Sequence, residues 1–192
     1  DLVIVGNVMS RGMGIIEKLL ESNIKHISGP QWLYENVLCK KTVIAISGTH
    51  GKTTTSSLVT WILKYAKLNP SYLIGGQPIN LSSPAKLTSS NFFIIEADEY
   101  DTSFFDKRSK YIHYHPNILV INNIEFDHAD IFENIDSVVK NFHHLVRIVP
   151  KNGKIIYNYD DKNIRKLIKK GIWSKEISMT SKNYKSPNWS LS

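Results

Sequence analysis

The sequence predicts an α/β protein with a mostly parallel sheet, and three observations support this class. Short runs rich in Ile, Val and Phe are almost continuously apolar, which is typical of strands covered on both faces. These runs alternate with segments whose apolar residues recur at helical spacing, as in right-handed β-α-β crossover units. Glycine and proline mark the turns between them.

The first 41 residues predict two strand-and-helix units. The expected elements are strands at 2–5 and 24–28 and helices at 14–22 and 31–37. Gly29-Pro30 is expected to break the chain before the second helix. Because a new strand follows Lys40-Lys41, we place a domain boundary near residues 39–41 and expect two domains, 1–41 and 42–192.

The remainder of the chain continues the alternation of strands and helices. The expected strands are 42–46, 92–96, 118–121 and 154–157, and the expected helices are 53–67 and 134–149. The basic segment 162–185 includes an amphipathic helix, with Ile164, Leu167, Ile168 and Ile172 at helical spacing. Residues 67–91 are rich in Gly, Pro and Ser, and we interpret them as mobile loops at an active site.

Composition and charge exclude several classes of protein. The net charge is +7, but the basic residues are 20 Lys and only 4 Arg, which favours a solvated lysine-rich surface over a nucleic-acid partner. The sequence has no run of about 18 apolar residues, so no membrane span is predicted. Cys39 is the only cysteine, so no disulfide can form within the chain and a reducing cytoplasm is expected.

The strongest local signal is the segment 47–55, Ser-Gly-Thr-His-Gly-Lys-Thr-Thr-Thr, between a predicted strand and a predicted helix. Glycines allow a tight turn whose N–H groups can point at phosphate, and the helix N-terminus adds positive charge. Lys52 can reach the outer phosphates, and the Thr53 hydroxyl can bind Mg²⁺. The expected nucleotide-binding residues are Gly48, Thr49, His50, Gly51, Lys52, Thr53 and Thr54.

Two further polar clusters follow strands of the predicted sheet. The first, residues 96–101, holds four carboxylates in six positions, which favours a cation such as Mg²⁺ beside Glu96. The second, residues 122–128, ends in Asp127-His128 and could bind a second metal. Histidine is an unusual ligand for Mg²⁺, so the residue types alone leave His128 open between a metal ligand and a structural residue.

The short form Gly-Thr-x-Gly-Lys-Thr resembles the ATP loop of the Mur ligase family. Asn123, Asp127 and His128 match that family's Asn-x-x-x-Asp-His motif position by position. The resemblance extends over residues 28–33, 96–110, 122–132 and 142–150. It implies a P-loop ATPase-like Mur ligase central domain, preceded by the end of a Rossmann-like domain that binds a UDP-sugar. Where several family members have a carbamylated lysine, the matching helix here has His143-His144.

The resemblance also implies a chemistry, with ATP and Mg²⁺ as cofactors. Lys52 and His128 would be catalytic, and Thr53, Glu96 and His128 would bind metal. The continuation at residues 100–110 is more like family members that join UDP-N-acetylmuramate (UDP-MurNAc) to the murein tripeptide L-alanyl-γ-D-glutamyl-meso-diaminopimelate during peptidoglycan recycling. A cytoplasmic monomer without nucleic-acid or membrane partners is expected.

Three alternatives remain beside this interpretation. The first is a ligase that attaches L-alanine to UDP-MurNAc, and the second is a non-catalytic remnant that only binds nucleotide phosphate. The third, a small P-loop kinase or GTPase, is disfavoured by the short loop. The UDP-binding turn, an adenine-binding segment and a closing domain are expected outside this chain. A half-built sheet would leave an unpaired edge and uncovered apolar faces, such as 118–121.

Overall fold

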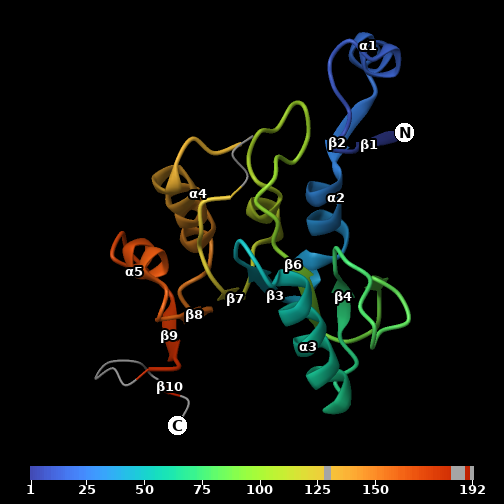
Figure 1. Ribbon diagram of the computed structural model, residues 1–192. Coiled ribbons are helices and arrows are strands. Elements are labelled where there is room, and N and C mark those ends of the chain that lie inside the picture. Colours follow the sequence, from blue (N-terminus) through green and yellow to red (C-terminus); the bar gives the residue numbers. More distant parts are fainter. Residues whose placement is uncertain (128–130, 183–188, 191–192) are drawn as a thin grey trace.

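The computed structural model describes residues 1–127, 131–182 and 189–190, and its main feature is an eight-stranded sheet (Figure 1). The strand order is β10-β9-β8-β7-β3-β6-β4-β5, and every neighbouring pair is parallel except β4 and β5. The strands are β3 (Thr42–Ser47), β4 (Ser71–Leu73), β5 (Ala85–Lys86), β6 (Phe92–Glu96), β7 (Ile118–Ile121), β8 (Lys154–Asn158), β9 (Lys175–Thr180) and β10 (Trp189–Ser190). The predicted α/β class with a mostly parallel sheet is confirmed.

Helices cover the two faces of this sheet because its central strand is apolar on both sides. Val43 and Ala45 of β3 belong to a core with α4 (Ile135–Arg147) and α5 (Lys162–Ile168). Ile44 and Ile46 point to the other face, where α3 (Lys52–Tyr65) packs. Figure 1 shows α3 apart from α4 and α5, which lie together farther along the sheet. No described helix is long and apolar enough to cross a membrane.

A separate two-stranded parallel sheet forms near the N-terminus. It pairs β1 (Leu2–Val5) with β2 (Lys25–Ser28), and α1 (Gly14–Glu21) packs on it through Ile16 and Leu19. Figure 1 places these three elements at one end of the molecule, joined to the large sheet through α2 (Gly29–Asn36). Two short 3₁₀ helices, η1 (Leu38–Lys40) and η2 (Lys110–Tyr114), complete the order of elements.

Two sequence predictions about local structure are wrong. Gly29-Pro30 does not break the chain but forms the first turn of α2, because Ser28 accepts a hydrogen bond from the Gln31 amide and proline suits the start of a helix. Residues 67–91 are not only loops, since β4 pairs with β6 inside the sheet and β5 pairs with β4. Ser71 and Tyr72 are therefore buried.

The apolar faces that we expected to be uncovered at residues 118–121 belong to a strand inside the sheet, because β7 pairs with β3 on one side and β8 on the other. Leu119 and Ile121 are fully buried, whereas Ile118 and Val120 on the opposite face are half-buried. The expected uncovered face is therefore limited to one side of β7. Beyond α5 the chain adds β9, a strand that the sequence interpretation did not include.

Candidate active site

The phosphate loop connects the end of β3 at Ser47 to the start of α3 at Lys52. Gly48 and Gly51 have φ values of 137° and 76°, which side chains rarely adopt. A Cβ on Gly48 would also lie 3.1 Å from Asn122 Cβ and from the Asn123 carbonyl oxygen. The first turn of α3 has no side-chain cap and no acidic residue, so its positive end is available for an anion.

The end of β7 holds this loop in place. The Thr49 amide donates to the Asn123 carbonyl at 3.1 Å, and the His50 amide donates to Asn123 Oδ1 at 2.8 Å. Asn123 Nδ2 donates back to the His50 carbonyl at 3.2 Å, and Asn122 Nδ2 donates to Thr55 Oγ1 at 2.9 Å. Two loop amides that we expected to face phosphate are thus bonded to Asn123. The amides left for a ligand are those at the start of α3.

Lys52 folds back over the loop. Its Nζ donates to the Gly48 carbonyl at 2.7 Å and lies 3.4 Å from the Thr49 carbonyl. It also lies 3.1 Å and 3.3 Å from the two carboxylate oxygens of Glu99. The side chains of Lys52 and Glu99 are only 16% and 2% exposed, so this ion pair is shielded from water. The sequence interpretation did not find this partner.

Lysines, rather than metal ions, compensate three of the four carboxylates that follow β6. Glu99 pairs with Lys52, Lys110 Nζ lies 2.7 Å from Asp98, and Lys107 Nζ lies 2.9 Å from Asp101. Glu96 differs from them, because its Oε1 is buried and has no hydrogen-bond partner among the described residues. An unpartnered buried carboxylate oxygen is costly unless a cation binds it, so Glu96 is the metal-binding candidate of this cluster.

Glu96 and Thr53 each lie against one glycine of the Gly75-Gly76 turn that follows β4. A Cβ on Gly75 would lie 2.8 Å from Glu96 Oε2, and a Cβ on Gly76 would lie 2.8 Å from Thr53 Cγ2 and 3.6 Å from its hydroxyl. Among the described residues, no three His, Cys, Asp or Glu side chains form a metal cluster. A hydroxyl and one carboxylate suit Mg²⁺, which takes its remaining ligands from water and phosphate oxygens.

A cavity of about 630 Å³ lies at the carboxyl ends of β3 and β6, with Lys52, Gly75 and Glu96 in its lining and with Thr53 and Glu99 outside it. Its lining includes Thr49, His50, Lys52, Glu96, Asp98, Lys110 and Asp127. Carboxyl ends of parallel strands are the usual ligand edge of an α/β sheet. Thr54 is exposed on the outer side of the first turn of α3. His128, expected as a catalytic and metal-binding residue, lies outside the described residues.

The remaining histidines have local partners instead of a shared site. His143 Nε2 lies 3.3 Å from the Gly171 carbonyl oxygen, and its ring packs against Trp173. His113 Nε2 lies 2.9 Å from Asp106 Oδ2, and burial lowers the pKa of His113 despite this carboxylate. Burial also lowers the pKa of His144. No described contact gives His143 or His113 a role at the phosphate loop.

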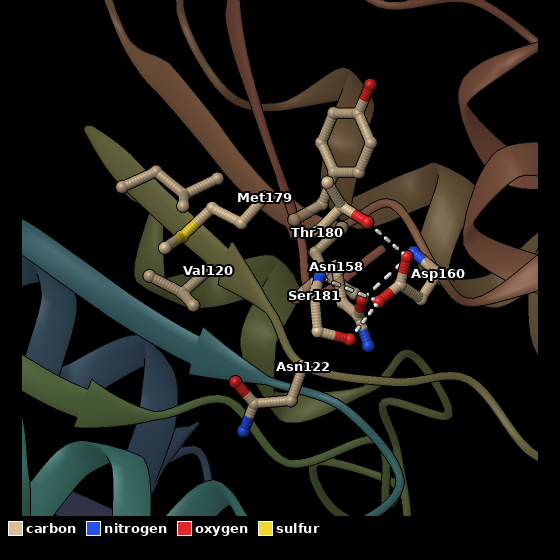
Figure 2. Close-up of a pocket in the computed structure, with 10 residues that line it drawn as sticks. Val120, Asn122, Asn158, Asp160, Met179, Thr180 and Ser181 are labelled. Atoms are coloured by element: carbon tan, nitrogen blue, oxygen red, sulfur yellow. Dashed lines mark hydrogen bonds between the residues drawn. The ribbon is translucent and has the colours of Figure 1, made fainter. Parts of the chain in front are cut away.

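A second cavity, of about 380 Å³, lies beyond Asn122 at the ends of β7, β8 and β9 (Figure 2). Val120 and Met179 point toward each other across it, and polar side chains form its rim. Asp160 accepts hydrogen bonds from the Ser181 amide at 3.0 Å and the Ser181 hydroxyl at 2.8 Å, and also from Thr180. These bonds lower the pKa of Asp160 to about 2.

The parallel sheet and the glycine-rich loop between β3 and α3 define an α/β protein with a loop of the phosphate-binding type. Residues 46–189 match the Mur ligase middle domain. Because this match covers most of the sequence, the chain belongs to the Mur ligase family. The resemblance that the phosphate loop suggested is thereby confirmed.

Individual relatives narrow the comparison. The chain is 53% identical over 176 residues to the UDP-N-acetylmuramate--L-alanyl-gamma-D-glutamyl-meso-2,6-diaminoheptandioate ligase of Escherichia coli K12, covering 92% of this chain and 38% of that protein. The crystal structure of the corresponding ligase from Neisseria meningitides has a TM-score of 0.89 and 47% identity, with 93% of this chain and 58% of that chain covered. A UDP-N-acetylmuramate--L-alanine ligase from Caldicellulosiruptor bescii is 41% identical over 128 residues, which are 67% of this chain and 27% of that protein.

Proposed function

We propose that this chain is part of an ATP-dependent ligase of peptidoglycan recycling that joins UDP-MurNAc to L-alanyl-γ-D-glutamyl-meso-diaminopimelate. The chain spans about two fifths of the length of its E. coli relative, so the activity concerns the whole protein. The observation that favours nucleotide-dependent chemistry is the buried Glu96 Oε1, which has no hydrogen-bond partner in the described part of the chain and lies near the turn that also contacts Thr53 at the uncapped start of α3. The higher identity to the tripeptide ligase than to the L-alanine ligase favours the tripeptide.

The reaction proceeds through an acyl phosphate. A carboxylate oxygen of UDP-MurNAc attacks the γ-phosphorus of ATP, and ADP leaves. The amino group of the tripeptide then attacks the acyl carbon, loses a proton and displaces inorganic phosphate. Lys52 and the first-turn amides of α3 stabilise the negative charge on the transferred phosphoryl group. This stabilisation lowers the barrier because it is stronger in the transition state than in the ground state.

The residues at the site fit a magnesium-dependent version of this chemistry. Thr53 and Glu96 would hold one Mg²⁺, and His128 would hold a second. Bound there, Mg²⁺ would screen the repulsion between the γ-phosphate and the attacking carboxylate. The chain's own lysines leave this position open, because Lys110 pairs with Asp98 and not with Glu96.

The N-terminal residues concern the proposed binding of the UDP-sugar. We propose that residues 1–41 are the end of a Rossmann-like domain for the UDP-sugar and that 42–192 belong to the ATP-binding domain. β1 and β2 form their own sheet, separate from the large one, which supports a distinct N-terminal unit, whereas Leu38 already packs in the core of the large sheet. A cytoplasmic monomer that binds neither nucleic acid nor membrane remains part of this proposal.

The test uses the full-length protein that contains this chain. It is incubated with UDP-MurNAc, the tripeptide, ATP and Mg²⁺, while phosphate release and product mass are followed together. We expect one phosphate per UDP-MurNAc-tripeptide, and no product when ATP is omitted. Product with L-alanine but not with the tripeptide would identify an L-alanine ligase. Nucleotide binding without any amide product would favour a non-catalytic remnant.

A further inference from the structure

We infer that Glu99 is a positioning residue for Lys52, holding its ammonium group beside the phosphate loop while phosphate oxygens bind. This inference rests on the proposed function, since it assigns Lys52 to the transferred phosphoryl group. It starts from a contact that the sequence did not reveal. Glu99 lies directly after the strand end that supplies Glu96, yet its carboxylate points to Lys52 Nζ with both oxygens within 3.3 Å.

The two kinds of contact made by Lys52 Nζ differ in how easily they can be exchanged. Its bonds to the Gly48 and Thr49 carbonyls involve neutral acceptors, which a phosphate oxygen can replace. Its contact with Glu99 involves a carboxylate that is only 2% exposed. A carboxylate so deeply buried cannot easily lose its cation, because water does not reach it to compensate. The ammonium group therefore keeps Glu99 and exchanges the carbonyls when nucleotide binds.

Among the neighbouring carboxylates, Glu99 is the one that pairs with Lys52. Asp98 and Asp101, its acidic neighbours in sequence, pair with Lys110 and Lys107 instead. The Tyr111 side chain is fully buried near Glu99, and burial raises its pKa, with the negative charges of Glu99 and Asp98 adding to the effect. Lys52, and not Lys107 or Lys110, is the lysine that pairs with Glu99.

A fixed ammonium group matters most in the transition state. Lysine has a flexible stem, so an unanchored Lys52 would sample many positions around the phosphates. Binding of ATP tolerates such freedom, whereas stabilisation of the transferred phosphoryl group requires a preorganised charge. Removal of the Glu99 charge also removes a repulsion toward the polyphosphate, which offsets loss of ground-state affinity. The expected signature is a lower kcat with little change in KM for ATP.

The experiment compares Glu99→Gln, Glu99→Asp and the control Glu21→Gln, which changes an exposed glutamate in α1, in the full-length protein. We expect Glu99→Gln to lower kcat at least tenfold while KM for ATP stays within threefold of wild type. Glu99→Asp keeps the charge and should recover part of the loss. Circular dichroism and Tm show how much of each variant is folded, and kcat is expressed per folded molecule.

The outcomes separate this inference from the proposed function. If the wild type forms no amide bond with ATP, the proposed function is wrong. If the wild type is active and Glu99→Gln keeps kcat within twofold, or lowers kcat and raises KM by similar factors, the positioning role is wrong. If Glu99→Gln does not fold, Glu99→Asp decides by the same split between kcat and KM. Binding of inorganic tripolyphosphate to this chain, measured by calorimetry, should weaken at least tenfold in Lys52→Ala but at most threefold in Glu99→Gln.

Discussion

Replacement of Lys52 by alanine should affect stability as well as catalysis. The substitution removes the Lys52 ammonium group from the Glu99 carboxylate, whose side chain is only 2% exposed. Loss of one partner of a buried ion pair typically costs roughly 3–5 kcal/mol in the free energy of unfolding. Because Lys52 itself is 16% exposed and water can enter the space it leaves, we expect the lower end, about 3 kcal/mol.

The catalytic effect of the same substitution is separate. Loss of one preorganised charge from the proposed phosphoryl-transfer site should raise the barrier by about 3 kcal/mol, or roughly a hundredfold in kcat of the full-length protein. The sequence alone predicts that the fold survives this change. The structure indicates a folded but destabilised variant, so activity must be measured well below the temperature at which the variant unfolds.

Urea unfolding of this chain tests the stability argument in a double-mutant cycle. The four proteins are the wild type, Lys52→Ala, Glu99→Gln and the double variant. Since glutamine leaves no buried charge, the double variant should be more stable than Lys52→Ala by more than 1 kcal/mol. The reasoning is refuted if Lys52→Ala unfolds within 0.5 kcal/mol of wild type, or if the two substitutions are simply additive; these thresholds are about the error of such cycles.

Three other predictions follow from the structure. Gly75→Ala should lower the Mg²⁺-dependent activity of the full-length protein roughly tenfold, since its Cβ would lie 2.8 Å from Glu96 Oε2, whereas the control Gly14→Ala, with open space around it, should not. The Arg108 guanidinium lowers the pKa of Asp106 from 3.8 to about 2, so the pair should stabilise the fold above pH 4 and lose this contribution as the pH falls toward 2, and because Arg108 is largely exposed the effect should be small; Asp106→Asn should remove this contribution to the pH dependence of urea unfolding. This chain by itself should bind Mg²⁺-ATP only weakly and form no UDP-MurNAc-tripeptide by mass spectrometry, because it spans 38% of the length of its E. coli relative and its phosphate-loop contacts must offset most of the entropy of association.

The predictable part of the fold is the part that local pattern determines. β3, β6, β7 and β8 were predictable because their residues are apolar on both faces, as in buried parallel strands. β4 was not predictable, because three residues between Pro70 and Gly75 form a strand only through pairing with β6. The start of α2 was mispredicted because Gly-Pro is a turn signal in isolation but a helix start when Ser28 caps it.

In the candidate site, too, features set by neighbouring residues were predictable, whereas contacts between distant residues were not. The phosphate loop and the acidic cluster each consist of consecutive residues, so the chemistry of each was predictable. Which cation compensates which carboxylate was not predictable, because Lys52 and Glu99 are 47 positions apart and only the β3–β6 pairing brings them together. Four carboxylates in six residues therefore suggested a metal for the cluster, whereas the structure leaves one candidate ligand, Glu96.

The strand order explains why these distant residues form one site. β3 lies between β6 and β7, so the loop after β3 has the acidic cluster on one side and Asn122 and Asn123 on the other. The β7 side fixes the backbone of the loop through Asn123, and the β6 side fixes the side chain of Lys52 through Glu99. Because both anchors come from strand ends that are rigidly paired with β3, the ammonium group and the free amides of α3 keep a defined relative position before any ligand arrives. Such preorganisation is what a phosphoryl-transfer site requires.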